Sequence, residues 1–377
     1  MSLQDLAEIS RFYGSNSDYV IAGGGNTSFK DGDYLYIKAS GASLANAQPG
    51  DFVKMNRAAL ARIWEKNYPA EAGSREAAVL ADMMAARAPG EEAKRPSVET
   101  LLHDILPFAF AVHTHPALVN GLTCARQGRE AARELFPDSI WIPSINPGYI
   151  LSKAVKDAMD SYRAEKGETA GIIFLQNHGI FAGAGEPEGV KAVYDRIMAA
   201  IEGRVKRRPD LSGEAASFGN SDSLAGELKE AAARISGEAR WFVRFGRNRE
   251  LCRFTADREA FKPLSSAFTP DHIVYAGSEP LFIESAAAGS AGALTEALKR
   301  HREKTGRLPR IAALQGLGVF GLGNSEKAAA NAVELFNDAA RVAVYTESFG
   351  GPLFMPPDQI DFINNWEVER YRSKVSA

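Results

Sequence analysis

Three of the six histidines in this 377-residue chain lie in two short pieces of sequence. His113 and His115 are separated by one residue, Thr114, so a strand would direct both imidazoles to the same face of a sheet. His178 follows the apolar run at residues 172–175 and precedes a glycine. A histidine pair alone is equally consistent with ordinary hydrogen-bonded side chains at a strand end. The third histidine favours one divalent metal with an open coordination position, and the all-nitrogen donor set favours Zn²⁺.

A carboxylate precedes the histidine pair. Glu99 falls in the first turn of a helix that we expect to begin at Ser97, whose hydroxyl can cap it. Glu99 and His103 are four residues apart and so share one face of that helix. A glutamate at a helix start is also favoured by the helix dipole alone, so the residues themselves leave open whether Glu99 is chemical or structural.

Two loops combine glycine with small polar side chains. Gly25 ends a run of three glycines and is followed by Asn26, Thr27 and Ser28, while Ser40 and Gly41 follow the strand expected at 34–38. Glycines let a backbone approach an anion closely, and uncharged donors suit a phosphate. A glycine-rich hairpin turn is the alternative, because the first loop lacks the lysine of a P-loop.

Read in order, these motifs resemble the class II aldolase/adducin family over about residues 10–205. The resemblance rests on five short motifs in register, which are Gly25-Asn26-Thr27-Ser28, Ala39-Ser40-Gly41, Pro96-Ser97-Val98-Glu99, His113-Thr114-His115-Pro116 and Asn177-His178-Gly179. It implies a class II aldolase-like three-layer α/β/α sandwich, with Glu99 as the catalytic carboxylate and His113, His115 and His178 as metal ligands. It further implies a sugar-phosphate site formed by Gly25, Asn26, Thr27, Ser40, Gly41 and Ser97. Val98 departs from the family, which has a hydroxyl there, and this removes one possible phosphate contact.

These parts would suit the cleavage of a ketose 1-phosphate to dihydroxyacetone phosphate and an aldehyde. A metal polarises the carbonyl, a carboxylate moves a proton at the neighbouring carbon, and an anchored phosphate orients the substrate. Relatives with the same motifs include epimerases, dehydratases and decarboxylases, and adducin-like members are non-catalytic binding modules, so these remain alternatives. The resemblance also implies a homo-oligomer in which a tyrosine of a neighbouring subunit reaches the site, and Tyr149 is the candidate here.

Composition narrows the class of protein. The net charge is −3 and 45% of residues are hydrophobic, which predicts a packed core and no basic field for nucleic acid. Cys124 and Cys252 form neither a disulfide framework nor a paired metal motif. No apolar stretch reaches the roughly 18 residues of a membrane span. We therefore expect a cytoplasmic protein that binds neither membrane nor nucleic acid, and the family resemblance implies a small phosphorylated sugar as its ligand.

Periodicity predicts alternating helices and strands in the first half of the chain. Helices are expected over residues 3–13, 74–88, 116–124, 151–164 and 186–205, and strands over residues 19–22, 34–38, 51–55, 108–113, 140–143 and 172–177.

A change in composition near residue 207 predicts two domains. We expect a catalytic domain over 1–208, a linker over 209–222, and a second, degenerate α/β lobe over 223–377. This lobe resembles the aldolase half of the family's bifunctional rhamnulose-phosphate aldolase/dehydrogenase proteins.

The second lobe also repeats the first in sequence. Residues 136–142 are echoed at 269–275 and residues 175–181 at 314–320, with Leu317 in place of His178, so the copy is predicted to lack a metal site. Gly316, Gly318 and Gly321 have the spacing of a dinucleotide fingerprint. We reject that interpretation because no suitable acidic residue follows about 20 positions on.

Overall fold

The computed structural model describes residues 2–213, 215–284 and 292–366. Within these ranges the chain forms two compact units. The amino-terminal unit holds residues 2–123, 127–204 and Trp366, and the carboxyl-terminal unit holds the remainder. The segment expected as a linker is hydrogen-bonded to the carboxyl-terminal unit, because Asp210 N–H donates to Glu250 at 3.0 Å and Ala215 N–H to the Arg247 carbonyl at 3.1 Å.

The amino-terminal unit is built on a seven-stranded sheet with the order β3-β2-β1-β4-β7-β6-β5. Its strands are β1 (Asn26–Asp31), β2 (Tyr34–Lys38), β3 (Phe52–Asn56), β4 (Phe110–Thr114), β5 (Ile140–Ile142), β6 (Ile172–Leu175) and β7 (Gly179–Ala184). Neighbouring strands are antiparallel except for β5 and β6, which are parallel.

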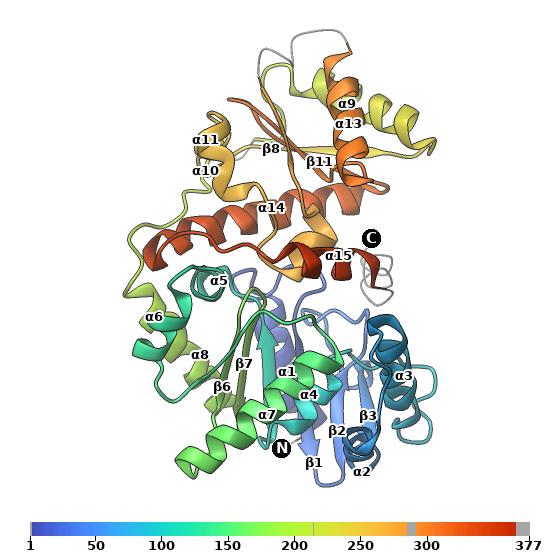
Figure 1. The fold of residues 1–377 in the computed structure, drawn as a ribbon, viewed down its shortest axis with the longest axis vertical. Coiled ribbons are helices and arrows are strands. Elements are labelled where there is room, and N and C mark those ends of the chain that lie inside the picture. The colour runs from blue at the N-terminus through green and yellow to red at the C-terminus, as the bar shows by residue number, and fades with distance from the viewer. Residues whose placement is uncertain (1, 214, 285–291, 367–377) are drawn as a thin grey trace. The chain divides into compact units, whose positions relative to one another are not determined.

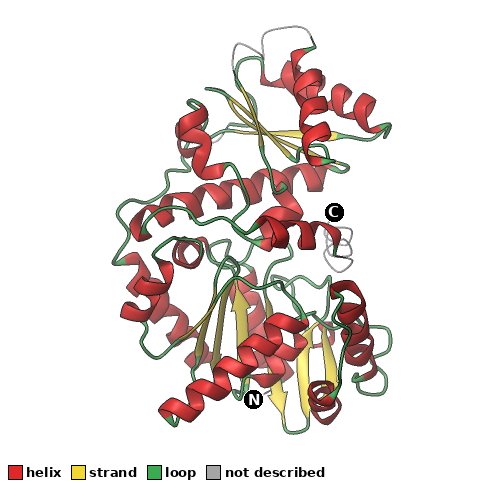
Figure 2. Cartoon of the chain, viewed as in Figure 1, coloured by secondary structure: helices red, strands yellow, loops and turns green. Residues whose placement is uncertain are grey.

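Helices cover both faces of this sheet (Figures 1 and 2). On one face lie α1 (Leu3–Gly14) and α8 (Pro187–Glu202), where the Ser10 hydroxyl bonds the Thr27 hydroxyl of β1 at 2.6 Å. On the other lie α4 (Thr100–Ile105) and α7 (Tyr149–Lys166), which share an apolar core with β5 and β6. Because side chains alternate along a strand, Asn26 and Ser28 point to the α4 side when Thr27 points to α1. The expected three-layer α/β/α fold is confirmed.

Most of the expected elements of the first half are present, with several differences, one of which is that strand β7 was not expected. The strand expected at 19–22 is absent, and β1 instead begins at Asn26, so residues 26–28 lie in a strand and not in a turn. The helix expected from Ser97 begins at Thr100, with Glu99 as its N-cap residue. The sequence did not predict α2 (Arg57–Ala61) and α6 (Gly128–Leu135). The two further helices are α3 (Ala72–Ala85) and α5 (Ala117–Thr123).

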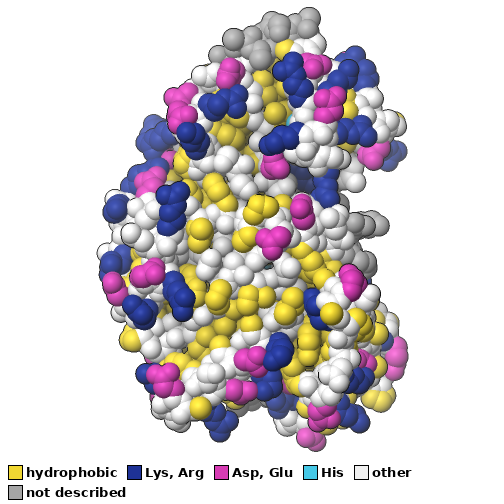
Figure 3. All heavy atoms as spheres, in the orientation of Figure 1, with side chains coloured by type: hydrophobic (Ala, Val, Ile, Leu, Met, Phe, Trp, Pro, Cys, Tyr) yellow, Lys and Arg dark blue, Asp and Glu magenta, His cyan; other side chains and the backbone are white. Residues whose placement is uncertain are grey.

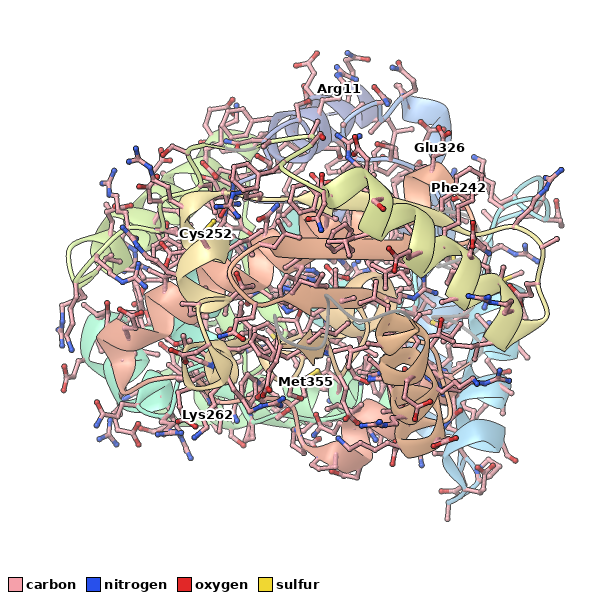
Figure 4. The ribbon with its side chains drawn as sticks, turned by 90° about the horizontal axis from the view of Figure 1, so that it is seen from above. Arg11, Phe242, Cys252, Lys262, Glu326 and Met355 are labelled. Atoms are coloured by element: carbon pink, nitrogen blue, oxygen red, sulfur yellow. The ribbon has the colours of Figure 1, made fainter. Side chains whose placement is uncertain are left out.

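The carboxyl-terminal unit contains a four-stranded sheet, β8 (Phe242–Gly246), β11 (Gly318–Gly323), β10 (Ile311–Leu314) and β9 (Leu281–Ile283), in that spatial order. Phe242 marks the start of β8 in Figure 4. One face packs on α9 (Ser221–Ser236) and α13 (Ala293–Thr305). The other receives α14 (Glu326–Thr346), whose close approach needs Gly321, since a Cβ there would lie 2.4 Å from the Ala329 carbonyl oxygen. Shorter helices are α10 (Arg249–Phe254), α11 (Arg258–Phe261), the π-helical η4 (His272–Ala276) and α15 (Pro357–Asn365).

The order β8-β11-β10-β9 matches the order β4-β7-β6-β5 of the first sheet, with the same strand directions. The hairpin of β6 and β7 corresponds to that of β10 and β11, as the second sequence echo predicts. The correspondence predicted from the first echo is wrong. Ile140–Ile142 is strand β5, whereas residues 273–275 lie in η4. The strand that takes the place of β5 in the second sheet is β9. Gly316, Gly318 and Gly321 belong to the β10–β11 hairpin and do not join a strand to a helix.

Two further features concern membrane crossing and surface charge. In the described ranges, no helix combines the length and apolar character needed to cross a membrane. On the face drawn in Figure 3, acidic and basic side chains are interspersed.

Candidate metal centre

The three histidines singled out in the sequence come together at one end of the seven-stranded sheet. His113 lies near the end of β4, His115 directly follows that strand, and His178 lies in the turn between β6 and β7. One ligand nitrogen of each lies within 4.8 Å of those of the other two. His113 is fully buried, and the other two are partly exposed. The cluster therefore has a closed side within the fold and an open side.

Hydrogen bonding sets the orientation of His113. Its Nδ1–H donates to the Ile180 carbonyl of β7 at 2.9 Å, which leaves Nε2 with a lone pair facing the other histidines. The Nε2 atoms of His113 and His115 are 2.8 Å apart, so both face the same small space. The ring of Phe181 stacks on His113 at a centroid distance of 4.1 Å and holds the imidazole plane.

Glu99 completes the cluster. Its Oε1 lies 3.4 Å from Nε2 of His113 and 3.6 Å from Nε2 of His178, and the side chain is buried. No hydrogen-bond donor reaches this buried oxygen within the described residues. A buried carboxylate oxygen without a donor is costly unless a positive charge lies beside it. A divalent cation held by the three imidazoles would supply that charge, so the residues present fit the metal that the sequence predicts.

A second set of side chains fixes the other oxygen of Glu99. The amide nitrogen of Asn26 donates to Oε2 at 2.5 Å, and the Asn26 amide oxygen accepts from Nε2–H of His103. The Nδ1 of His103 lies 2.7 Å from the Ser28 hydroxyl. Burial, with smaller effects of Lys30 and His113, holds the pKa of His103 well below its usual value. The ring is therefore neutral, and because Nε2 carries its proton, Ser28 must donate to Nδ1.

Close backbone approaches build the centre. A Cβ on Gly179 would lie 2.5 Å from the Thr114 carbonyl oxygen and 2.6 Å from Cδ2 of His115. Gly25 adopts a φ of +69°, and a Cβ there would lie 2.7 Å from the His113 carbonyl oxygen. Asn177 takes a left-handed φ of 57° in the turn that presents His178. Side chains at either glycine would push apart the strands that align the histidines.

The residues proposed from sequence to bind phosphate fall into two groups. Ser40 and Ser97 lie in adjoining loops beside Glu99, since the Ser40 hydroxyl donates to the Pro96 carbonyl at 3.1 Å and the Ser97 hydroxyl accepts from Glu99 N–H at 3.2 Å. Gly41 follows Ser40 with a φ of +89°. Ser97 therefore adjoins Glu99, and Ser40 and Gly41 lie in a loop that contacts the loop carrying Ser97.

Asn26 and Thr27 have other roles than the sequence suggested. The Asn26 amide is engaged by Glu99 and His103, so it positions the carboxylate. Thr27 is fully buried and its hydroxyl bonds Ser10 on the opposite face of the sheet, which places it away from the histidines. Gly25 serves the close approach of β1 to β4 described above.

Tyr149 is the first residue of α7. Its ring packs against Trp64 and Tyr68, with centroid distances of 5.7 and 5.1 Å, and its N–H donates to Glu76 at 3.0 Å. Within this unit the tyrosine belongs to an aromatic cluster.

Residues 4–200 match the Class II Aldolase and Adducin N-terminal domain, which covers more than half of the chain. A Bacillus subtilis protein named "Uncharacterized oxidoreductase YuxG" is 20% identical over 413 residues, and the match spans 98% of this chain but 58% of that protein. A solved class II aldolase domain from Thermoplasma acidophilum is 25% identical, with a TM-score of 0.46, over 54% of this chain and 93% of its own. An L-fuculose 1-phosphate aldolase structure is 16% identical, with a TM-score of 0.37, over 53% and 82% of the two chains. The family match rests on the segment that contains the three histidines and Glu99, and the chain belongs to the class II aldolase and adducin family.

Proposed function

We propose that this protein is a metal-dependent aldolase that cleaves a ketose 1-phosphate to dihydroxyacetone phosphate and an aldehyde. One observation carries the proposal. The nitrogens of His113, His115 and His178 and the buried Oε1 of Glu99 converge on one small space, in a chain of the class II aldolase and adducin family. A purely structural role would not require three imidazoles to face a buried carboxylate oxygen that accepts no hydrogen bond from any described residue.

The three histidines would hold one divalent ion, with Zn²⁺ as the expected metal because the donors are all nitrogen. When bound, the ion acts as a Lewis acid on the carbonyl and hydroxyl oxygens of the substrate. We assign to Glu99 the proton transfer at C3 of the ketose, where it would give a proton after the C3–C4 bond breaks and, in the reverse direction, remove it. Asn26 and His103 hold the carboxylate in one orientation through Oε2.

We place the phosphate of the substrate at the loops that carry Ser40, Gly41 and Ser97. The Ser97 hydroxyl bonds Glu99 N–H, and the loop of Ser40 and Gly41 contacts the loop of Ser97, so a phosphate bound there would orient the ketose toward the carboxylate and the histidines.

The catalytic part of this proposal spans residues 1–208, and the lobe over 223–377 is its degenerate copy. The strand registers place Gly246 opposite Val319 as Thr114 is opposite Ile180. Phe245 and Arg247 therefore stand where the first sheet has His113 and His115, and Leu317 replaces His178. Arg247 donates to the carbonyl oxygens of Leu317 and Gly316, so a guanidinium occupies the place of the metal centre. The lobe over 223–377 would form subunit contacts in a cytoplasmic homo-oligomer, and the first domain would carry out the catalysis.

Activity on a panel of ketose 1-phosphates tests the proposal. The protein would be stripped of metal, reloaded with Zn²⁺, and assayed for dihydroxyacetone phosphate through coupled NADH oxidation, with His178→Ala as the inactive control. Restoration of product by Zn²⁺ in the wild type alone is the expected result. Release of an epimerised sugar or of CO₂ in place of dihydroxyacetone phosphate would assign one of the other reactions catalysed in this family. If the wild-type protein binds less than one equivalent of metal, and His178→Ala does not change that amount, the proposal of an enzyme loses its basis.

A further inference from the structure

A cavity of about 400 Å³ lies within the carboxyl-terminal unit. Its walls come from η4, the loop before β9, the end of α13, the loop before β10, and α15. Ile273, Leu308 and Ile360 contribute apolar side chains to the lining, and Arg307 and Arg310 contribute cationic ones. A cavity of this size with a few convergent polar groups is typical of a small-molecule site.

Arg310 is the unusual member of this wall. Its backbone is fixed, since Leu322 N–H donates to its carbonyl at 2.7 Å, and its stem packs beside Gly277, where a Cβ would lie 3.4 Å from Cβ of Arg310. Its guanidinium makes no hydrogen bond or ion pair with any described residue. By contrast, Arg207 bonds both Glu250 and Glu347, and Arg258 bonds Glu284. The side chain is only partly exposed, and burial, with the nearby charge of Arg307, lowers its pKa.

The charges around the cavity do not balance. Arg307 donates to the Asn364 carbonyl at 3.4 Å and to Asn365 Oδ1 at 3.2 Å, but it has no carboxylate partner within the described residues. Glu279 is paired with Lys304 at 2.7 Å. Asp361 lines the cavity and forms no ion pair with either arginine in the described ranges. Among the described residues, two arginines therefore line the cavity with one carboxylate that has no ion-pair partner, and the surplus charge is positive.

We propose that this cavity binds a small organic phosphate monoester. Two guanidinium groups with unused N–H donors suit the oxygens of a phosphate, which they can bind in a forked geometry. The apolar wall formed by Ile273, Leu308 and Ile360 would receive the carbon part of the ligand. The site shares no residue with the metal centre, so the inference is independent of the proposed aldolase activity.

Calorimetric titration of the full-length protein with phenyl phosphate tests the inference, with inorganic phosphate and phenol as the two partial probes. Arg310→Gln should weaken binding at one site about 10-fold or more, the loss expected when a charged hydrogen-bonding group is removed. Arg300→Gln is the matched control, because Arg300 lies on α13 outside this cavity and pairs with Glu296. Unchanged phenyl phosphate binding in Arg310→Gln would overturn the proposal. An affinity for inorganic phosphate equal to that for phenyl phosphate would show that the cavity does not recognise the carbon part of the ligand.

Two further variants keep the test decisive if Arg310→Gln does not fold. Arg307→Gln, at an exposed residue, should weaken binding, and Asp361→Asn should strengthen it by removing the repelling carboxylate. If neither shifts the affinity, the cavity is not the site. Dihydroxyacetone phosphate release measured on the same variants separates the two proposals, since a chain without aldolase activity should still bind phenyl phosphate at Arg310.

Discussion

Asn26 donates a 2.5 Å hydrogen bond from its amide nitrogen to Oε2 of Glu99, and this contact sets which oxygen of the carboxylate faces the histidines. The amide itself is held because His103 donates to its oxygen and accepts from Ser28. A flipped amide would set two oxygens against each other at Glu99 and lose the bond from His103. The strand β1 and the helix α4 thus fix the carboxylate together.

His103→Phe tests this chain of contacts. The ring would lose its donor to Asn26, so the amide would be free to rotate and Glu99 to move, and we expect kcat to fall about 10-fold for one lost hydrogen bond. Zinc content should stay at the wild-type level because the three ligands are untouched. His103→Gln, whose amide can still donate to Asn26, should recover part of the rate. An unchanged kcat in His103→Phe would show that the network serves stability alone.

Glu99→Gln should keep the fold and the metal while losing most turnover. The amide has the shape of the carboxylate but cannot accept the proton, so the expected loss is about 10²- to 10⁴-fold in kcat. Elemental analysis and the thermal midpoint should match the wild type. If kcat stays near the wild-type value, Glu99 is a helix-start residue and another group moves the proton.

Gly179→Ala should damage the metal centre through sterics. Its Cβ would lie 2.5 Å from the Thr114 carbonyl oxygen and 2.6 Å from the His115 ring, so the turn must move and we expect a loss of about 1–3 kcal/mol in the free energy of unfolding. Zinc affinity should fall with it. Gly185→Ala is the matched control, since nothing lies within 4 Å of a Cβ at that position. Equal zinc affinity in both variants would contradict the proposed packing.

The sequence was sufficient for the parts of the site that depend on local periodicity. Residues two positions apart on a strand face the same way, so the sequence could place His113 and His115 together, and His178 followed from its position after an apolar strand. The family motifs implied the three-layer fold, and periodicity predicted the alternating helices and strands within it. Local patterns fail where contacts cross between distant elements.

Asn26 shows this limit. Three preceding glycines suggested a phosphate turn, but β4 and β2 pair with residues 26–31 on both sides and hold them in a strand. Asn26 and Ser28 are two positions apart, so both side chains lie on one face of strand β1. Glu99 and His103 are four positions apart, so both lie on one face of helix α4. The sequence could not show that β1 and α4 would be neighbours. The same applies to η4, where tertiary packing overrides the similarity between residues 269–275 and residues 136–142.

Lys30 provides a test of the pH dependence of stability. Its Nζ donates to the Phe108 carbonyl at 3.1 Å, and burial lowers its pKa to about 7, with Asp104 opposing the shift and Arg57 adding to it. An unfolded lysine keeps its proton to a pKa of about 10.4, so between about pH 7 and 10 the unfolded state binds the extra proton. Stability from this residue therefore rises with pH across that window, and below about pH 7 the cost of the buried charge is fully present.

Lys30→Met removes that cost. The thermal midpoint of the variant should exceed that of the wild type at pH 6–7, and the gap should narrow as the pH approaches 10 because the wild-type lysine is then neutral in the folded state. Differential scanning calorimetry from pH 6 to 10 measures the gap. Lys262→Met is the control, because Lys262 is an exposed lysine paired with Glu259 at the surface (Figure 4). A gap for Lys30→Met that stays constant or widens with pH would show that Lys30 remains charged in the folded protein.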